Sequence, residues 1–104
     1  MRMLFVCNQG KHRSRTAANL FKDKYEIRYA GLFSLTPVSK NDVEWAELII
    51  VMEDFQQDEL QQRFPAECLK NRIACLGIPD IYYCGQPELV KLIKEKMKKL
   101  KSEL

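Results

Sequence analysis

The sequence predicts an α/β fold in which a four-stranded parallel sheet carries helices on both of its faces. Short apolar runs alternate with helix-like segments along the chain, an order that is typical of parallel sheets. The run 48–52 is continuously apolar and rich in β-branched residues, as in a strand buried on both faces. Near the C-terminus, apolar residues recur with the spacing of an amphipathic helix. The 104 residues fit one domain, which we expect to span 1–104.

The first strand and the first helix are separated by a short polar turn. Residues 3–6 are apolar and predict a buried strand that ends at Cys7. A polar, glycine-containing turn covers residues 8–13. A helix is expected from about residue 14 to residue 25, with Tyr25 on its apolar face.

The next segment predicts a second strand followed by a short helix. Residues 26–32 have the composition of a strand, with a glycine near its end. Ser39, with Asp42 three residues later, resembles a helix N-cap signal. This helix is expected to end at about Ala46, directly before the apolar run of the third strand.

The second half of the chain repeats the alternation. Residues 55–63 predict a helix that Pro65 stops, and residues 72–76 predict the fourth strand. A loop follows, and Pro87 suits the first turn of a last helix. The apolar face of this helix is expected to comprise Val90, Ile93, Met97, Leu100 and Leu104. These elements complete a three-layer, flavodoxin-like α/β/α arrangement.

The amino-acid composition limits the kinds of protein that this chain can be. Hydrophobic residues make up 46% and charged residues 30%, which is typical of a globular protein. Because no apolar run approaches the roughly 20 residues of a membrane span, we expect a cytoplasmic protein with no membrane partner. Four cysteines without a CxxC pair and a single histidine predict reduced thiols, no metal site and no cofactor. The net charge of +3 is weak evidence for an anionic partner.

The turn after the first strand has the features of an anion site. It places a thiol, Cys7, and a guanidinium, Arg13, at its two ends, and a helix follows. Successive backbone N–H groups and a helix N-terminus attract anions, and the arginine fork matches two phosphate oxygens. The same field favours the thiolate form of a cysteine, which is the nucleophilic form, and Ser14 can donate a hydrogen bond to it. The expected substrate-binding loop residues are Asn8, Gln9, Gly10, Lys11, His12 and Ser14.

The segment Leu4-Phe5-Val6-Cys7-x5-Arg13-Ser14 resembles the signature of the low-molecular-weight protein tyrosine phosphatases. Their nucleophilic cysteine ends the first strand, and their general acid is an aspartate far downstream. The resemblance implies a phosphomonoester hydrolase that forms a phosphocysteine intermediate on Cys7, with a phosphoprotein or a small phosphoester as substrate. It spans most of the chain, and a weaker match covers residues 45–53.

The segment Asp80-Ile81-Tyr82-Tyr83 resembles the Asp-Pro-aromatic motif of the same family. The resemblance implies that Asp80 is the general acid and that Tyr82 and Tyr83 form the wall of the active site. Cys7, Glu53, Asp54 and Asp80 each follow the end of a strand. Because the carboxyl ends of parallel strands share one edge of the sheet, we expect these four residues on one rim.

The loop also departs from the family pattern. Gly10 stands where the family usually has an asparagine that braces the loop, and His12 stands where many members have a second cysteine. Ile81 replaces the usual proline of the acid loop. Lys11, His12 and Arg15 make the loop basic, which suits a substrate with extra negative charge, such as a nucleotide or an RNA end. Nucleic acid is considered only as such a substrate.

Other functions with related chemistry remain open at this stage. Phosphocarrier domains of sugar transport also place a cysteine and a glycine-containing turn after the first strand, and they pass the phosphoryl group on without hydrolysis. A noncatalytic phosphate-binding module is a second alternative. Arsenate reduction would need further reactive thiols, and Cys68, Cys75 and Cys84 lack a spacing that identifies such a relay. Arg13 followed by Ser14, together with the late aspartate, favours hydrolysis.

Overall fold

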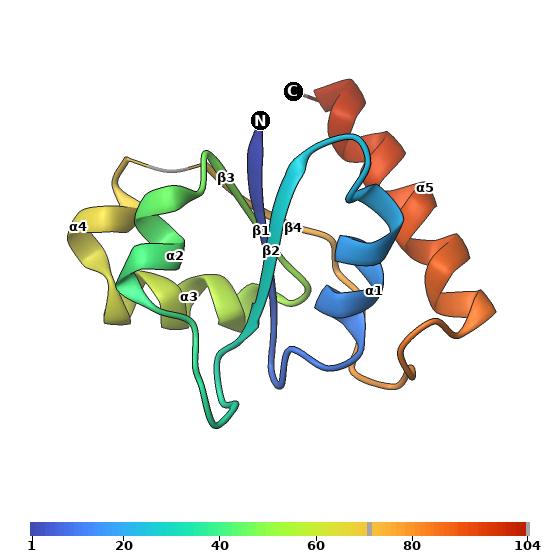
Figure 1. The fold of residues 1–104 in the computed structure, drawn as a ribbon, viewed down its shortest axis with the longest axis horizontal. Coiled ribbons are helices and arrows are strands. Elements are labelled where there is room, and N and C mark those ends of the chain that lie inside the picture. Colours follow the sequence, from blue (N-terminus) through green and yellow to red (C-terminus); the bar gives the residue numbers. More distant parts are fainter. Residues whose placement is uncertain (71, 104) are drawn as a thin grey trace.

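The computed structural model describes residues 1–70 and 72–103, which form a parallel sheet between two layers of helices (Figure 1). The sheet has four strands in the order β2-β1-β3-β4, and every neighbouring pair is parallel. The predicted α/β fold is therefore confirmed. The strands are β1 (Arg2–Cys7), β2 (Glu26–Gly31), β3 (Leu48–Val51) and β4 (Arg72–Cys75).

Two helices cover one face of the sheet and three cover the other (Figure 1), counted over the same described residues. The first group consists of α1 (Arg13–Phe21) and α5 (Pro87–Glu103). The second group consists of α2 (Lys40–Trp45), α3 (Asp54–Arg63) and α4 (Pro65–Cys68). As the sequence predicts, α2 begins with a capping box in which Ser39 and Asp42 bond each other's backbone N–H groups.

Strand β1 supplies side chains to both hydrophobic cores because successive residues of a strand point to opposite faces. Met3, Phe5 and Cys7 belong to the core under α1 and α5. Leu4 and Val6 belong to the core under α2, α3 and α4. Burial of each large apolar side chain contributes about 1.5–3 kcal/mol, so β1 is firmly held along its length. The last residue of this fixed strand is Cys7, which gives its thiol a defined position.

The strand order places a crevice beside Cys7. From β1 the chain crosses to β2 on one side of the sheet, and β3 then adds on the other side of β1. In open parallel sheets such a change of direction leaves a crevice at the carboxyl ends of the strands, where ligands bind. The loops after β1 and β4 both lie at this edge, opposite the start of β1 and the end of α5 (Figure 1).

The structure differs from the predicted elements in the end of the first helix, in an additional short helix and in the buried face of the last helix. Helix α1 ends at Phe21 instead of continuing to Tyr25, because the chain turns there and the N–H groups of Lys24 and Tyr25 both bond the carbonyl of Phe21. Pro65 starts the short helix α4 as well as ending α3, since proline fits a first helical turn. The buried face of α5 begins at Leu89, while Val90 is half-buried, and Leu104 lies outside the described residues.

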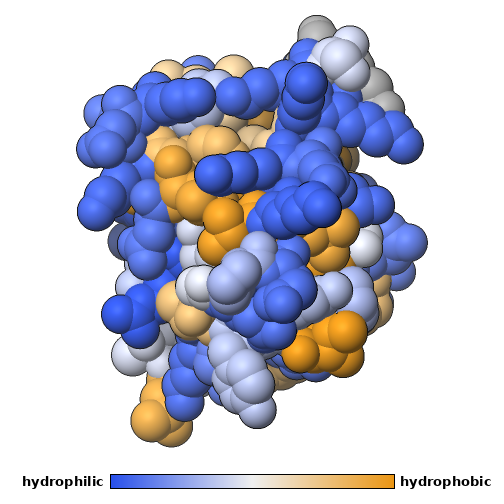
Figure 2. All heavy atoms as spheres, turned by 90° about the vertical axis from the view of Figure 1, so that its right-hand side faces the viewer, coloured by the Kyte–Doolittle hydropathy of each residue, from blue (hydrophilic) through white to orange (hydrophobic). Residues whose placement is uncertain are grey.

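Helix α5 is strongly amphipathic. Its buried residues Leu89, Ile93 and Met97 pack in the core shared with α1. Five of its lysines are exposed, and the face of the molecule formed by α1 and α5 shows hydrophilic side chains with hydrophobic patches between them (Figure 2). The exposed lysines are Lys91, Lys94, Lys98, Lys99 and Lys101. Within the described residues, none of the helices combines the length and apolar character that crossing a membrane requires.

Candidate active site

The thiol of Cys7 lies at the N-terminus of α1, inside a tight loop. Its Sγ atom is 3.1 Å from the hydroxyl oxygen of Ser14 and accepts a hydrogen bond from the Gly10 N–H at 3.2 Å. Both Cys7 and Ser14 are buried. Because hydrogen-bond donors surround the sulfur and the positive end of a helix points at it, the surroundings favour negative charge at this position.

The buried side chain of Arg13 is hydrogen-bonded at only one edge of its guanidinium group. It is only 1% exposed, and its Nη1 atom donates to Glu53 Oε1 at 2.5 Å and to the Ile78 carbonyl at 2.7 Å. Its Nε and Nη2 atoms are buried without a hydrogen-bond partner among the described residues. Such buried unpaired donors are rare and costly in proteins. One edge of the guanidinium is therefore anchored, and the other is free to bind an anion.

Asp80 faces the free edge of Arg13 without forming a close ion pair. Its Oδ2 atom is 3.7 Å from Arg13 Nη2 and 3.5 Å from Asn8 Nδ2, both long distances for hydrogen bonds. Its side chain is 49% exposed. The carboxyl group is thus close to the free guanidinium edge and open to solvent.

These groups line one hollow of about 390 Å³. Besides Cys7, Arg13 and Asp80, its walls are formed by Gln9, His12, Ile81, Tyr82 and Tyr83. The structure therefore brings most of the residues expected from the sequence into one place. Asp54 lies at the same carboxyl edge of the sheet but lines a different hollow, beside Cys75 and Gly77, and so takes no part in the hollow of Cys7.

The loop over residues 8–12 takes its shape from two glycines that touch. Gly10 has a φ of +70°, a conformation that glycine adopts at little cost. A Cβ atom on Gly31, at the end of β2, would lie 2.3 Å from the Gln9 carbonyl carbon. A Cβ on Gly10 would lie 2.8 Å from the Gly31 nitrogen. The loop over residues 8–12 can therefore approach β2 only because both side chains are absent.

Gly31→Ala is expected to cost about 1–3 kcal/mol of stability and to displace the loop around Cys7, because the added methyl group would overlap the backbone of Gln9. Val43→Ile is the control, since it overpacks the buried contact of α2 with the sheet and leaves the loop untouched. Urea unfolding of both variants and the rate at which a thiol reagent alkylates Cys7 check this. If Gly31→Ala lost stability yet kept the wild-type alkylation rate of Cys7, the contact would not shape the site.

Gln56 ties the loop over residues 8–12 to α3. It is fully buried on α3, and its Oε1 atom accepts from the N–H groups of Met52 and Glu53 at 2.8 and 2.9 Å. Its Nε2 atom donates to Asn8 Oδ1 at 2.9 Å. The side chain of Asn8 is thus held by α3 instead of lining the hollow. Sequence reasoning missed Gln56, although Glu53 and Gln56 have the spacing of a capping box.

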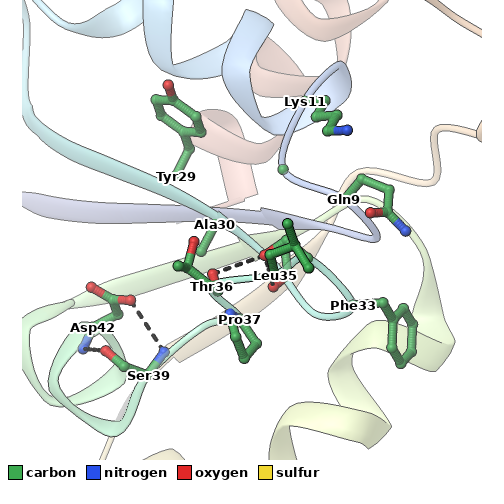
Figure 3. A pocket seen from close by; sticks show the side chains of 13 residues that line it. Gln9, Lys11, Tyr29, Ala30, Phe33, Leu35, Thr36, Pro37, Ser39 and Asp42 are labelled. Atoms are coloured by element: carbon green, nitrogen blue, oxygen red, sulfur yellow. Dashed lines mark hydrogen bonds between the residues drawn. The ribbon is translucent and has the colours of Figure 1, made fainter.

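A second hollow of about 770 Å³ adjoins the loop on the side of β2. Gln9 lines both hollows. Figure 3 shows Gln9 and Lys11 reaching it from the loop after β1, Tyr29 from β2, and Phe33 and Leu35 from the segment that follows β2. Lys11, expected to bind substrate, therefore lies beside the hollow of Cys7 and not within it.

The remaining cysteines differ from Cys7 in their surroundings. Burial raises the pKa of the Cys68 thiol. Burial also raises the pKa of Cys75, with a further contribution from a hydrogen bond to Asp54. Cys84 is exposed, and its backbone N–H donates to His12 Nδ1 at 3.1 Å. Cys68 and Cys75 are thus held as neutral thiols away from the hollow of Cys7.

Known structures match the fold of this chain. No protein-family model and no curated protein sequence matches the chain. Among solved structures, the YwlE arginine phosphatase from Geobacillus stearothermophilus shares 24% identity with a TM-score of 0.71, covering 98% of this chain and 94% of that one. The tyrosine phosphatase Wzb from Escherichia coli K30, in complex with phosphate, shares 18% identity with a TM-score of 0.80, covering 99% and 97%.

A third structure carries the family name in full. The low-molecular-weight phosphotyrosine phosphatase VcLMWPTP-2 from Vibrio cholerae O395 shares 19% identity with a TM-score of 0.78, covering 99% of this chain and 95% of that one. Nearly the whole chain is therefore matched in each case, at low sequence identity. The chain has the fold of the low-molecular-weight phosphatases, as its Cys7–Ser14 and Asp80–Tyr83 motifs predict.

Proposed function

We propose that this protein is a cysteine-dependent phosphomonoester hydrolase of the protein tyrosine phosphatase type. The observation that carries the proposal is the buried free edge of Arg13, which shares one hollow with the thiol of Cys7. A phosphoryl group seated there would satisfy both unpaired N–H groups in the bidentate manner that suits arginine. Its phosphorus would then face the sulfur.

The first chemical step forms a phosphocysteine. The thiolate of Cys7 attacks phosphorus in line, a P–S bond forms and the P–O bond to the leaving group breaks. Asp80 donates a proton to the departing oxygen. Arg13 and the backbone amides of the loop stabilise the charge on the equatorial oxygens, and Ser14 stabilises the thiolate that leaves in the second step.

The second step hydrolyses the intermediate. A water molecule attacks phosphorus, and the carboxylate of Asp80 takes its proton. The P–S bond breaks, which releases inorganic phosphate and restores the thiolate of Cys7. The protonated Asp80 is then ready for the next substrate. The sum of both steps consumes one phosphomonoester and one water and yields one alcohol or phenol and one phosphate.

The proposed substrate is a phosphotyrosine-like aryl phosphate. The rings of Tyr82 and Tyr83 line the hollow next to Asp80, where the leaving group would sit, and two of the matched structures are named as tyrosine phosphatases. We place the protein in the cytoplasm, because the reaction requires Cys7 to stay reduced and that compartment keeps thiols reduced.

Product stoichiometry with an aryl phosphate, in the presence of a metal chelator, tests the proposal against its alternatives. A hydrolase releases phenol and inorganic phosphate in equal amounts over many turnovers. A phosphocarrier releases about one phenol per protein and keeps the phosphoryl group on Cys7. A binding module releases neither product. Either of the last two results would replace the proposed function.

A second candidate substrate carries negative charge beyond one phosphate group, as a nucleotide does. The position of Lys11 in the adjoining hollow favours it. Lys11→Ala is expected to lower kcat/KM for nucleotide monophosphates about two- to fivefold more than for phosphotyrosine peptides, the scale of one exposed charge. Arg15→Ala is the control, because the structure places Arg15 exposed on α1 and in the lining of neither hollow. Equal losses on every substrate would rule out recognition of the extra charge.

A further inference from the structure

We propose that the imidazole of His12 positions the loop that carries Asp80, so that the phosphate-binding loop holds its own general acid in place. This inference rests on the proposed function, because it concerns the acid of that reaction. It assigns a role to a side chain that the reaction steps leave unused. His12 is here a positioning residue, acting through Asp80.

The acid loop, residues 77–86, has a glycine near each of its ends. It connects the end of β4 to the start of α5 without helix or strand. Gly77 and Gly85 have φ values of +69° and +76°, and a Cβ atom on either would meet no atom within 4 Å. No neighbouring atoms pack closely against these two glycines. The position of the segment between them therefore depends on the hydrogen bonds and contacts that hold each end of the loop.

The first anchor holds the beginning of the loop. The Ile78 N–H donates to the Met52 carbonyl at 2.8 Å, and the Ile78 carbonyl accepts from Arg13 Nη1 at 2.7 Å. The side chain of Ile78 is fully buried in the core under α5. This end of the loop is therefore fixed two residues before Asp80.

The second anchor lies beyond the tyrosines and depends on His12. The Cys84 N–H donates to His12 Nδ1 at 3.1 Å, and the ring of Tyr83 meets the imidazole edge-on with centroids 5.8 Å apart. The next residue, Gly85, donates its N–H to Thr16 Oγ1 at 2.9 Å. Thr16 Oγ1 in turn donates to the backbone carbonyl of His12 at 2.6 Å, so this anchor has two parts: the imidazole of His12 holds Tyr83 and Cys84, and the Thr16 hydroxyl holds Gly85.

Between the anchors, Tyr82 packs against the core under α5, and the Tyr83 N–H donates to Gln86 Oε1 at 3.0 Å. Ile81 and Tyr83 are 70% and 74% exposed, and the Asp80 side chain reaches the phosphate-binding loop through the long contacts to Asn8 and Arg13. Loss of the imidazole would release Tyr83 and Cys84 from the phosphate-binding loop, while Gly85 would stay bonded to Thr16, so the stretch that follows Asp80 would be held less tightly. The phosphate cradle would remain, because Arg13 and the loop braces do not involve the imidazole.

The hydrogen bond from Cys84 also defines the best conservative variant. Nδ1 must carry a lone pair to accept this bond, so the ring proton of a neutral His12 sits on Nε2. The Oδ1 atom of an asparagine lies at the same number of bonds from the backbone as Nδ1 of histidine, and it is also an acceptor. His12→Asn should therefore keep the hydrogen bond from the Cys84 N–H, while His12→Ala removes it.

The experiment compares two aryl phosphates whose leaving groups differ in their need for a proton. On phenyl phosphate, His12→Ala is expected to lower kcat/KM about 10- to 100-fold, the scale of misplacing a catalytic group by about 1 Å. On dinitrophenyl phosphate, whose leaving group departs without a proton, kcat/KM should change by less than about threefold. His12→Asn should recover most of the loss on phenyl phosphate.

Equal losses on the two esters for His12→Ala, or failure of His12→Asn to rescue, would overturn the inference. Asp80→Asn separates this failure from failure of the proposed function. If Asp80→Asn itself shows no dependence on the leaving group, the assignment of the acid is wrong. If the loss of kcat/KM in Asp80→Asn does depend on the leaving group, the double variant with His12→Ala should show no further leaving-group-dependent loss. Both changes then act through the same proton transfer. Additive losses would contradict the positioning role.

Discussion

Cys7→Ser is expected to abolish turnover while leaving the phosphate site intact. The thiol lies at the N-terminus of α1, between the Ser14 hydroxyl and the Gly10 N–H, and a serine hydroxyl in its place is not ionised there. The expected loss in kcat is about 10⁴-fold or more, the scale of removing a catalytic nucleophile. Steady-state hydrolysis of an aryl phosphate measures it.

Phosphate binding is the control within the same variant. Arg13 and its anchors, Glu53 and Ile78, do not involve the Cys7 sulfur, so the dissociation constant for inorganic phosphate should stay close to that of the wild type. Cys84→Ser changes an exposed thiol and keeps the backbone amide, and it should retain full activity. Substantial turnover by Cys7→Ser would refute Cys7 as nucleophile.

Arg13→Lys should produce the second large effect, a fall in kcat/KM of about 10²- to 10³-fold, as for loss of one transition-state donor. A lysine ammonium cannot bond Glu53 and Ile78 and still offer a planar fork to phosphate, whereas the guanidinium does both. Inorganic phosphate should raise the melting temperature of the wild type, because a ligand stabilises the state that binds it, and should not do so in the variant.

Arg63→Lys is the matched control. Arg63 also bonds a carboxylate, Glu59, and a backbone carbonyl, that of Leu32, at 2.9 and 2.7 Å, but away from Cys7. It tests the general cost of replacing an anchored arginine. If both variants lost phosphate-induced stabilisation to the same extent, Arg13 would have no special part in anion binding.

The framework of the fold can be predicted from the sequence because burial on both faces leaves a clear pattern in each central strand. The run from Leu48 to Val51 is fully buried, and its apolar character is unbroken. Boundaries were harder to predict where tertiary contacts decide them. Tyr25 continues the helical spacing, but the chain turns after Phe21 so that the Glu26 N–H can bond the Met1 carbonyl at the start of β2.

In the site, sequence reasoning found the residues that belong to short motifs. Cys7, Arg13 and Asp80 share one hollow although the third is remote in sequence. It could not find partners whose role depends on distant pairing. Gly31 matters because it touches Gln9, and Gln56 matters because it reaches Asn8 across the edge of the sheet. Neither contact follows from local spacing.

Direct detection of a phosphoryl group on Cys7 is the measurement that tests the central claim most directly. Asp80→Asn, which slows attack by water, is mixed with an activated aryl phosphate and a metal chelator, quenched rapidly with denaturant and digested for mass spectrometry. The account predicts one phosphoryl group on the peptide that contains Cys7, formed together with the burst of phenol. A burst of phenol without phosphorylated Cys7, or with the phosphoryl group on another residue, would contradict it.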